Sequence, residues 1–109
     1  MVHEFDKYTY RVMWSEEDEE FVGLCAEFPG LSWLESAPET ALKGIRSLVI
    51  DCIEDMKNNN ESIPEPIAMK NYSGEFMVRV SPEVHRHLAI EAAEHGVGLD
   101  RVVSAKLTP

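Results

Sequence analysis

One short strand pattern, late in the chain, has no partner strand nearby. Residues 75–80 alternate apolar and polar side chains, end at Ser81-Pro82-Glu83, and precede two short helical patterns separated at Gly96. A lone strand leaves both backbone edges unpaired, and a piece of about 40 residues is near the lower limit for independent folding. We therefore expect this strand to pair with a strand of another chain.

This order of strand, helix and helix resembles the ribbon-helix-helix family of DNA-binding dimers. In that family two copies of the strand form an antiparallel ribbon that enters a DNA major groove. Successive side chains of a strand point to opposite faces, so alternation divides the segment in two. The apolar face, which would form the dimer core, consists of Phe76, Val78 and Val80. The face turned toward DNA would consist of Glu75, Met77 and Arg79.

The expected DNA contacts differ in strength. Arg79 is the main candidate, because a guanidinium can pair with the O6 and N7 atoms of guanine. Met77 offers only apolar contact, for example to a thymine methyl group, and Glu75 is repelled by phosphates unless it accepts from cytosine N4. The homodimer is the expected DNA-binding species, and the sequence leaves open whether the front parts also associate into a tetramer.

The resemblance implies a second contact, at the start of the last helix, where backbone amides and the helix dipole face a phosphate. The residues at that position are Gly98, Leu99, Asp100 and Arg101. Gly98 is an acceptable helix cap, whereas Asp100 repels the phosphate that would dock there. Arg101 and Lys106 compensate in part. We therefore expect modest DNA affinity with a shallow dependence on salt.

Charge is distributed unevenly along the 109 residues, which carry a net charge of −10. Residues 1–70 hold 15 acidic and 6 basic side chains, a net charge of −9, and residues 71–109 hold 5 and 4, a net charge of −1. An acidic front half suggests a basic partner or simply serves solubility. A content of 44% apolar and 28% charged residues is typical of a folded, soluble protein. With no apolar run of membrane length and no leader pattern, we expect a cytoplasmic protein.

The front half predicts three strands. Residues 8–14 alternate with aromatic and β-branched side chains, and the five acids at 16–20 then form a turn. A second strand is expected over 21–28, and Pro29-Gly30 turns the chain into a third over 31–35. One face of the second strand would carry Val22, Leu24, Ala26 and Phe28.

One long helix follows the strands. Ser36 and Glu39 have the spacing of a capping box at its start. We expect the helix to run to about Lys57 and to end at the asparagines 58–60. Its apolar stripe consists of Leu42, Ile45, Leu48 or Val49, Cys52 and Met56. Residues 63–66 must be extended because two prolines restrict them. The sequence therefore predicts an α+β domain over residues 1–70, a three- to four-stranded antiparallel sheet packed with one helix, followed by a ribbon-helix-helix domain over 71–109.

Five stretches of the chain together resemble the HicB antitoxins of bacterial type II toxin-antitoxin systems, in the branch with a C-terminal ribbon-helix-helix domain. They are YTYRV at 8–12, WSEED at 14–18, GLCAEFP at 23–29, IPEP at 63–66 and YSGEFMVRV at 72–80. The resemblance implies a degraded ribonuclease-H-like front domain that binds and covers a small HicA-type toxin, which cleaves RNA. It also implies a rear domain that binds the operator DNA of its own operon and represses it.

Several acidic and histidine side chains could in principle serve catalysis or bind a metal. Asp51, Glu54 and Asp55 lie opposite the apolar stripe, so they form a solvated helix face and not a metal site. Glu27 ends a strand without a second carboxylate beside it. We therefore expect no enzyme activity, no metal and no cofactor. His85 and His87 point to different sides of a helix, which disfavours a shared metal.

The cysteines and tryptophans have structural interpretations. Cys25 and Cys52 sit in apolar patterns without metal or redox spacing, which indicates buried free thiols. Trp14 and Trp33 are expected in the core or in an interface, and one of them could belong to a toxin-facing surface. The alternative function is a dimeric protein-binding module that has lost DNA binding, which the acids at 75 and 100 favour.

Overall fold

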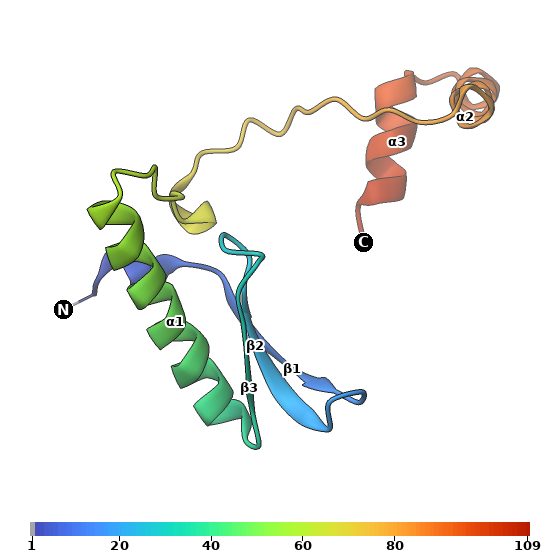
Figure 1. Cartoon of the computed structure of the whole chain (residues 1–109). Helices are drawn as coiled ribbons and strands as arrows, with labels where there is room; N and C mark the ends of the chain where they lie inside the picture. The colour runs from blue at the N-terminus through green and yellow to red at the C-terminus, as the bar shows by residue number, and fades with distance from the viewer. Residues whose placement is uncertain (1) are drawn as a thin grey trace. The chain divides into compact units, whose positions relative to one another are not determined.

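The computed structural model describes residues 2–109 and divides the chain into two compact units, Met1–Tyr72 and Ser73–Pro109 (Figure 1). We call them the front unit and the rear unit and describe each by itself. The front unit contains η1 (Glu4–Lys7), β1 (Tyr10–Ser15), β2 (Glu20–Cys25), β3 (Ser32–Glu35), α1 (Pro38–Asn58) and η2 (Ile67–Met69). The rear unit contains α2 (Pro82–His95) and α3 (Leu99–Leu107). The predicted α+β class with one small antiparallel sheet is confirmed.

The sheet of the front unit is a three-stranded antiparallel meander in the order β1-β2-β3. β1 begins at Tyr10, two residues later than predicted. Tyr8 precedes the strand because its buried ring packs into the core while its hydroxyl donates to the carbonyl of Pro64 at 2.7 Å. β3 begins at Ser32, one residue later than predicted.

β2 ends at Cys25, so the predicted strand over 21–28 is too long by three residues. The Ala26 amide still continues the pairing with the β1 side by donating to the carbonyl of Thr9, and the chain then turns, since the Phe28 amide donates to the carbonyl of Cys25. This turn interrupts the alternation of side chains. Phe28 is buried in the same core as Cys25, and the prediction that it shares a face with Val22 is wrong.

α1 begins at Pro38, and its N-cap is Ala37, which has an extended backbone and no side-chain cap bond. The predicted capping box of Ser36 and Glu39 is therefore wrong. Proline suits the first helical position, because its missing N–H would have no partner there and its φ is already helical. The helix ends at Asn58, and Asn60 then adopts a left-handed φ of 56°, as asparagine tolerates.

α1 packs along one face of the sheet (Figure 1), and the core lies between them. The buried cluster consists of Tyr8, Cys25, Phe28, Ile45 and Val49. The buried side of α1 starts at Ala41, whereas Leu42, the first residue of the predicted stripe, is 40% exposed. Two glycines permit the close approach. A Cβ at Gly23 would lie 2.5 Å from the carbonyl oxygen of Ala41, and one at Gly44 would lie 2.1 Å from the indole of Trp33.

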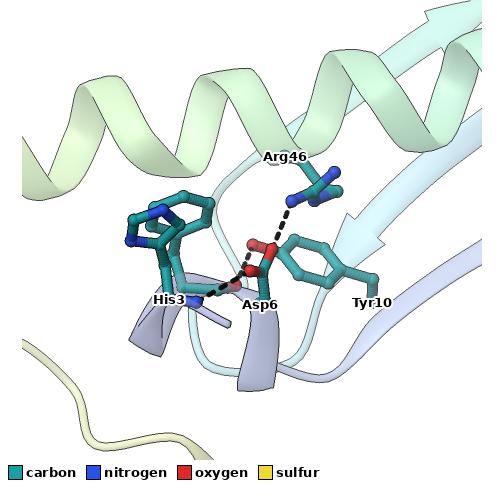
Figure 2. Close-up of polar contacts among 5 residues, drawn as sticks. His3, Asp6, Tyr10 and Arg46 are labelled. Atoms are coloured by element: carbon teal, nitrogen blue, oxygen red, sulfur yellow. Dashed lines mark hydrogen bonds and ion pairs between the residues drawn. The ribbon is translucent and has the colours of Figure 1, made fainter. Parts of the chain in front are cut away.

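η1 is held against α1 by a polar cluster (Figure 2). The carboxylate of Asp6 accepts from the backbone amide of His3 at 2.9 Å and forms an ion pair with Arg46. The His3 amide, together with Arg46, lowers the pKa of Asp6 although burial opposes this. The hydroxyl of Tyr10 donates to the carbonyl of Phe5 at 2.8 Å, and burial raises the pKa of Tyr10 to about 12. The ion pair joins η1 to the middle of α1, and the Tyr10 bond joins η1 to the first residue of β1.

The rear unit has well-defined helix ends. The Ser81 hydroxyl caps α2 by accepting from the Val84 amide at 3.3 Å, and Gly96 ends the helix with a left-handed φ of 66°. Gly98 caps α3 without a side-chain bond. The predicted helix boundary at Gly96 and the predicted helix cap at Gly98 are confirmed. No helix within residues 2–109 is long and apolar enough to cross a membrane.

Candidate functional site

The segment 75–80, on which the predicted DNA interface depends, belongs to no helix or strand in the single chain. The predicted strand is therefore not formed by one copy alone. All six residues are exposed, and two of the three that would build a dimer core, Phe76 and Val78, are 76% and 59% exposed. Large apolar side chains left this open in an otherwise folded unit indicate a missing partner.

A wide groove of about 1030 Å³ runs along the rear unit between this segment, α2 and α3. Its apolar lining consists of Phe76, Val78, Val80, Leu88, Leu99, Val103 and Leu107. Within residues 73–109 only Ala92 and Val102 are buried. The groove thus contains most of the apolar surface from which a core for this unit could be built.

The structure brings together some of the predicted DNA-binding residues. Glu75, Arg79, Leu99 and Asp100 all line the groove, whereas Met77 is 86% exposed and does not line it. The prediction that residues 75, 77 and 79 share one outward face is made for a paired ribbon, and one chain does not test it.

At the start of α3, the negative charge of Asp100 offsets the positive end of the helix dipole, which would otherwise attract a phosphate. The carboxylate of Asp100 folds back over Gly98, where an added Cβ would lie 2.8 Å from one of its oxygens. A negative group in this position stabilises the helix but repels a phosphate. Lys106, expected to compensate, pairs with Glu91 at 3.1 Å, while Arg101 is exposed and forms no ion pair within residues 2–109.

Glu27 has a structural role that the sequence did not predict. Its carboxylate accepts from the Ile67 amide at 2.8 Å, from the Thr9 amide at 2.9 Å and from the Thr9 hydroxyl at 3.1 Å. Burial raises the pKa of Glu27, but the amides of Ile67 and Thr9 outweigh it and lower the pKa overall. Its partners are 18 and 40 residues away in sequence, so no local pattern could have revealed them. Glu27 thus connects η2 to the residue that precedes β1 through these hydrogen bonds.

The remaining acids and the thiols show no assembled site. Asp51, Glu54 and Asp55 are exposed on α1, and no group of three or more potential metal-binding side chains occurs in the described part of the chain, residues 2–109. Cys25 is buried and Cys52 is half-buried, and both are free thiols. Burial raises the pKa of the Cys25 thiol, which disfavours the reactive thiolate.

Comparison with protein families gives one match. The model of the HicB family matches residues 58–107, which are 50 of the 109 residues, or just under half of the chain. The match begins at the last residue of α1 and ends at the last residue of α3, so it does not include the sheet. No curated protein and no solved structure matches the chain. The rear unit and the segment leading to it are thus similar to the HicB family.

Proposed function

We propose that this protein is an antitoxin that neutralises a HicA-type, RNA-cleaving toxin and represses its own operon. The observation that carries the proposal is the match of residues 58–107 to the HicB family. An antitoxin of this kind acts by covering its toxin, which requires a complementary surface and no chemistry of its own. The chain would therefore be a cytoplasmic binding protein without enzyme activity or cofactor.

In this proposal the rear unit is one half of a ribbon-helix-helix dimer. The segments 75–80 of two copies pair as antiparallel strands, and Phe76, Val78 and Val80 of each copy cover a shared core. The exposed state of these side chains beside the apolar groove favours such a partner. Fully burying one such side chain contributes about 1.5–3 kcal/mol, so six of them would stabilise the dimer substantially.

The paired ribbon would present Glu75, Met77 and Arg79 to a DNA major groove, with Arg79 supplying the hydrogen bonds to guanine. Residues 98–101 would approach a phosphate at the start of α3. Because Glu75 and Asp100 are acidic, we expect weak affinity for DNA in general and a strong dependence of specific binding on Arg79.

The front unit would be the toxin-binding part, with a degraded ribonuclease-H-like fold. Its sheet and single long helix are compatible with a remnant of such a fold. The net charge of −9 over residues 1–70 suits a basic partner that binds RNA. The negative charge accelerates the encounter with a basic protein and repels nucleic acid from the same surface.

The test is a titration of labelled DNA from upstream of the gene with the purified full-length protein, with and without the toxin, at two salt concentrations. Arg79→Ala should weaken binding by about 1–3 kcal/mol without changing the oligomeric state. Arg86→Ala, which removes an exposed arginine from α2, is the matched control and should change binding little. Equal binding by the wild type and Arg79→Ala would contradict the assigned readout.

A second function is favoured by the acids at positions 75 and 100. The protein would then be a dimeric protein-binding module whose rear unit serves assembly alone. In the same titration this function predicts no binding to upstream DNA, either with or without the toxin, while light scattering still detects a dimer.

A further inference from the structure

The sheet of the front unit has one face that no helix or other strand among residues 2–72 covers. Gly23 and Cys25 of β2 face α1, as the close approach of Gly23 to Ala41 and the place of Cys25 in the core establish. Residues directly opposite one another on neighbouring strands share a face, and alternate residues lie on the other. The pairing of Val22 with Met13 on β1 and with Leu34 on β3 therefore places these three side chains in one row on the far face.

This row, with Leu24 on the same face of β2, is here called the open-face patch: Met13, Val22, Leu24 and Leu34. Among the elements of residues 2–109, α1 is the only helix packed on the strands, and it lies on the opposite face. Met13 is 46% exposed and Leu34 is 44% exposed. Contiguous exposed apolar side chains on a sheet face indicate a surface used for binding.

The charges around the patch differ from one end to the other. The next pair on this face toward the β1–β2 turn is Ser15 and Glu20, and the turn itself contains four more acids, residues 16–19. None of these five acids forms an ion pair with another side chain of residues 2–109. Arg11 pairs with Leu24 at the other end. The patch is thus apolar in the middle, strongly negative at the turn and positive at its far end.

We propose that the open-face patch is the docking surface for a basic protein partner, whose apolar residues cover Met13, Val22 and Leu34 and whose lysines or arginines face the acidic turn. This inference rests on the proposed function and names the surface through which it is exercised. The charge selects the occupant. A second copy would bring another unit of the same strongly negative charge against this one, and nucleic acid would be repelled by the turn.

The experiment measures the affinity of the full-length protein for a purified HicA-type toxin, the partner in the proposed function, by isothermal titration calorimetry. Leu34→Lys places a positive charge within the patch, and Met13→Lys does the same on the neighbouring edge strand. Each should weaken binding at least about tenfold, because a lysine held against apolar partner groups and basic side chains is unfavourable. Leu42→Lys is the matched control: Leu42 is 40% exposed but lies on α1, so binding should change less than about twofold.

Folding and function are checked separately. Thermal unfolding followed by tryptophan fluorescence should show that all three variants retain the front unit. If the wild type binds the toxin and both patch variants bind equally well, the docking surface is overturned while the proposed function stands. If the wild type does not bind the toxin at all, both fail. A patch variant that changes the oligomeric state but not toxin affinity would assign the face to a second copy and overturn the proposal.

Discussion

The front unit buries Tyr8, Phe28, Ile45 and Val49 between its sheet and α1, whereas the rear unit, over residues 73–109, buries only Ala92 and Val102. Both units have well-formed helices, so the difference lies in what the helices pack against. In the front unit, β2 supplies glycine at the closest approach and the rest of the sheet closes the core. In the rear unit the corresponding apolar side chains line an open groove. One unit forms its buried core within a single chain, and the other requires a second copy in our proposal.

The strongest test of this contrast is Val78→Asp. A carboxylate in the proposed shared core has no compensating partner and is severely unfavourable, so the dimer should dissociate and the rear helices should melt. The front unit should keep its unfolding transition. Light scattering gives the mass, and helical circular dichroism gives the loss of α2 and α3.

The matched control for Val78→Asp is Met77→Asp, at the neighbouring position that is already 86% exposed. It should leave the dimer intact. A Val78→Asp protein that remains dimeric through its rear unit would show that the assignment of the two faces is wrong.

The next largest effect is expected from Ile45→Ala in the front unit. Ile45 is fully buried, and the cavity left by this substitution should lower the free energy of unfolding by about 2–5 kcal/mol. Both tryptophans, Trp14 and Trp33, belong to the front unit, so urea unfolding followed by fluorescence reports on it directly. Ile50→Ala, at a half-buried position of the same helix, should have a smaller effect. A matching loss of rear-unit stability would contradict the independence of the two units.

Glu27→Gln should destabilise the front unit by about 1–3 kcal/mol at neutral pH, because the amides of Thr9 and Ile67 lose a charged acceptor. The pKa of Glu27 is lowered in the folded state, so its contribution is present above the unfolded pKa and disappears as pH falls through the folded pKa. The wild type should therefore lose stability as the pH falls below the unfolded pKa of this carboxyl group and through its lower folded pKa, and the variant should lose less. Urea titrations across this range measure both.

The exposed Glu65 lies two residues before Ile67 and provides the control for that experiment. Glu65→Gln should leave the free energy of unfolding and its pH dependence nearly unchanged. If Glu27→Gln keeps the full acid dependence of the wild type, the bonds to Thr9 and Ile67 do not cause it.

The smallest expected effect concerns the start of α3. Asp100→Asn removes the negative charge that lies over Gly98 and should strengthen binding to upstream DNA by about 0.3–1 kcal/mol. The same substitution weakens the electrostatic support of the helix, so the rear unit should become slightly less stable. A DNA titration at low salt, paired with thermal unfolding, would detect these opposite changes. Unchanged DNA affinity would place Asp100 outside the interface.

Local patterns predicted most of the front unit because its strands and helix are periodic over short distances. The errors arise where tertiary structure overrides the pattern. The turn after Cys25 contains no glycine or proline before Phe28, so alternation alone extends the strand too far. The helix begins at Pro38, after the predicted cap at Ser36. Its buried face includes Ala41, whereas the predicted Leu42 is exposed.

The candidate site was predictable only in part. Alternation assigns Phe76 and Val78 to one face and Arg79 to the other, and this assignment stays a prediction for the paired ribbon, because the segment forms no strand in one chain. The role of Glu27 depends on Thr9 and Ile67, which come near it only after the whole unit has folded. The open-face patch has a weak signal in sequence, since β2 is apolar on both faces. The patch is exposed because, among residues 2–72, only α1 covers the sheet and it lies on the other face. A local pattern of residues cannot predict which face of a sheet stays uncovered.

The burial of Cys25 has a further, practical consequence. Both cysteines of the chain lie in the front unit; Cys25 is 2% exposed, and burial raises the pKa of its thiol. An alkylating reagent can modify it only when β2 separates from α1, so its labelling rate measures how often that unit opens. The rear unit contributes no thiol to the signal. The rate of Cys25 alkylation, measured by mass spectrometry, therefore reports how often the front unit opens. It can be measured while the rear unit is paired, unpaired or bound to DNA.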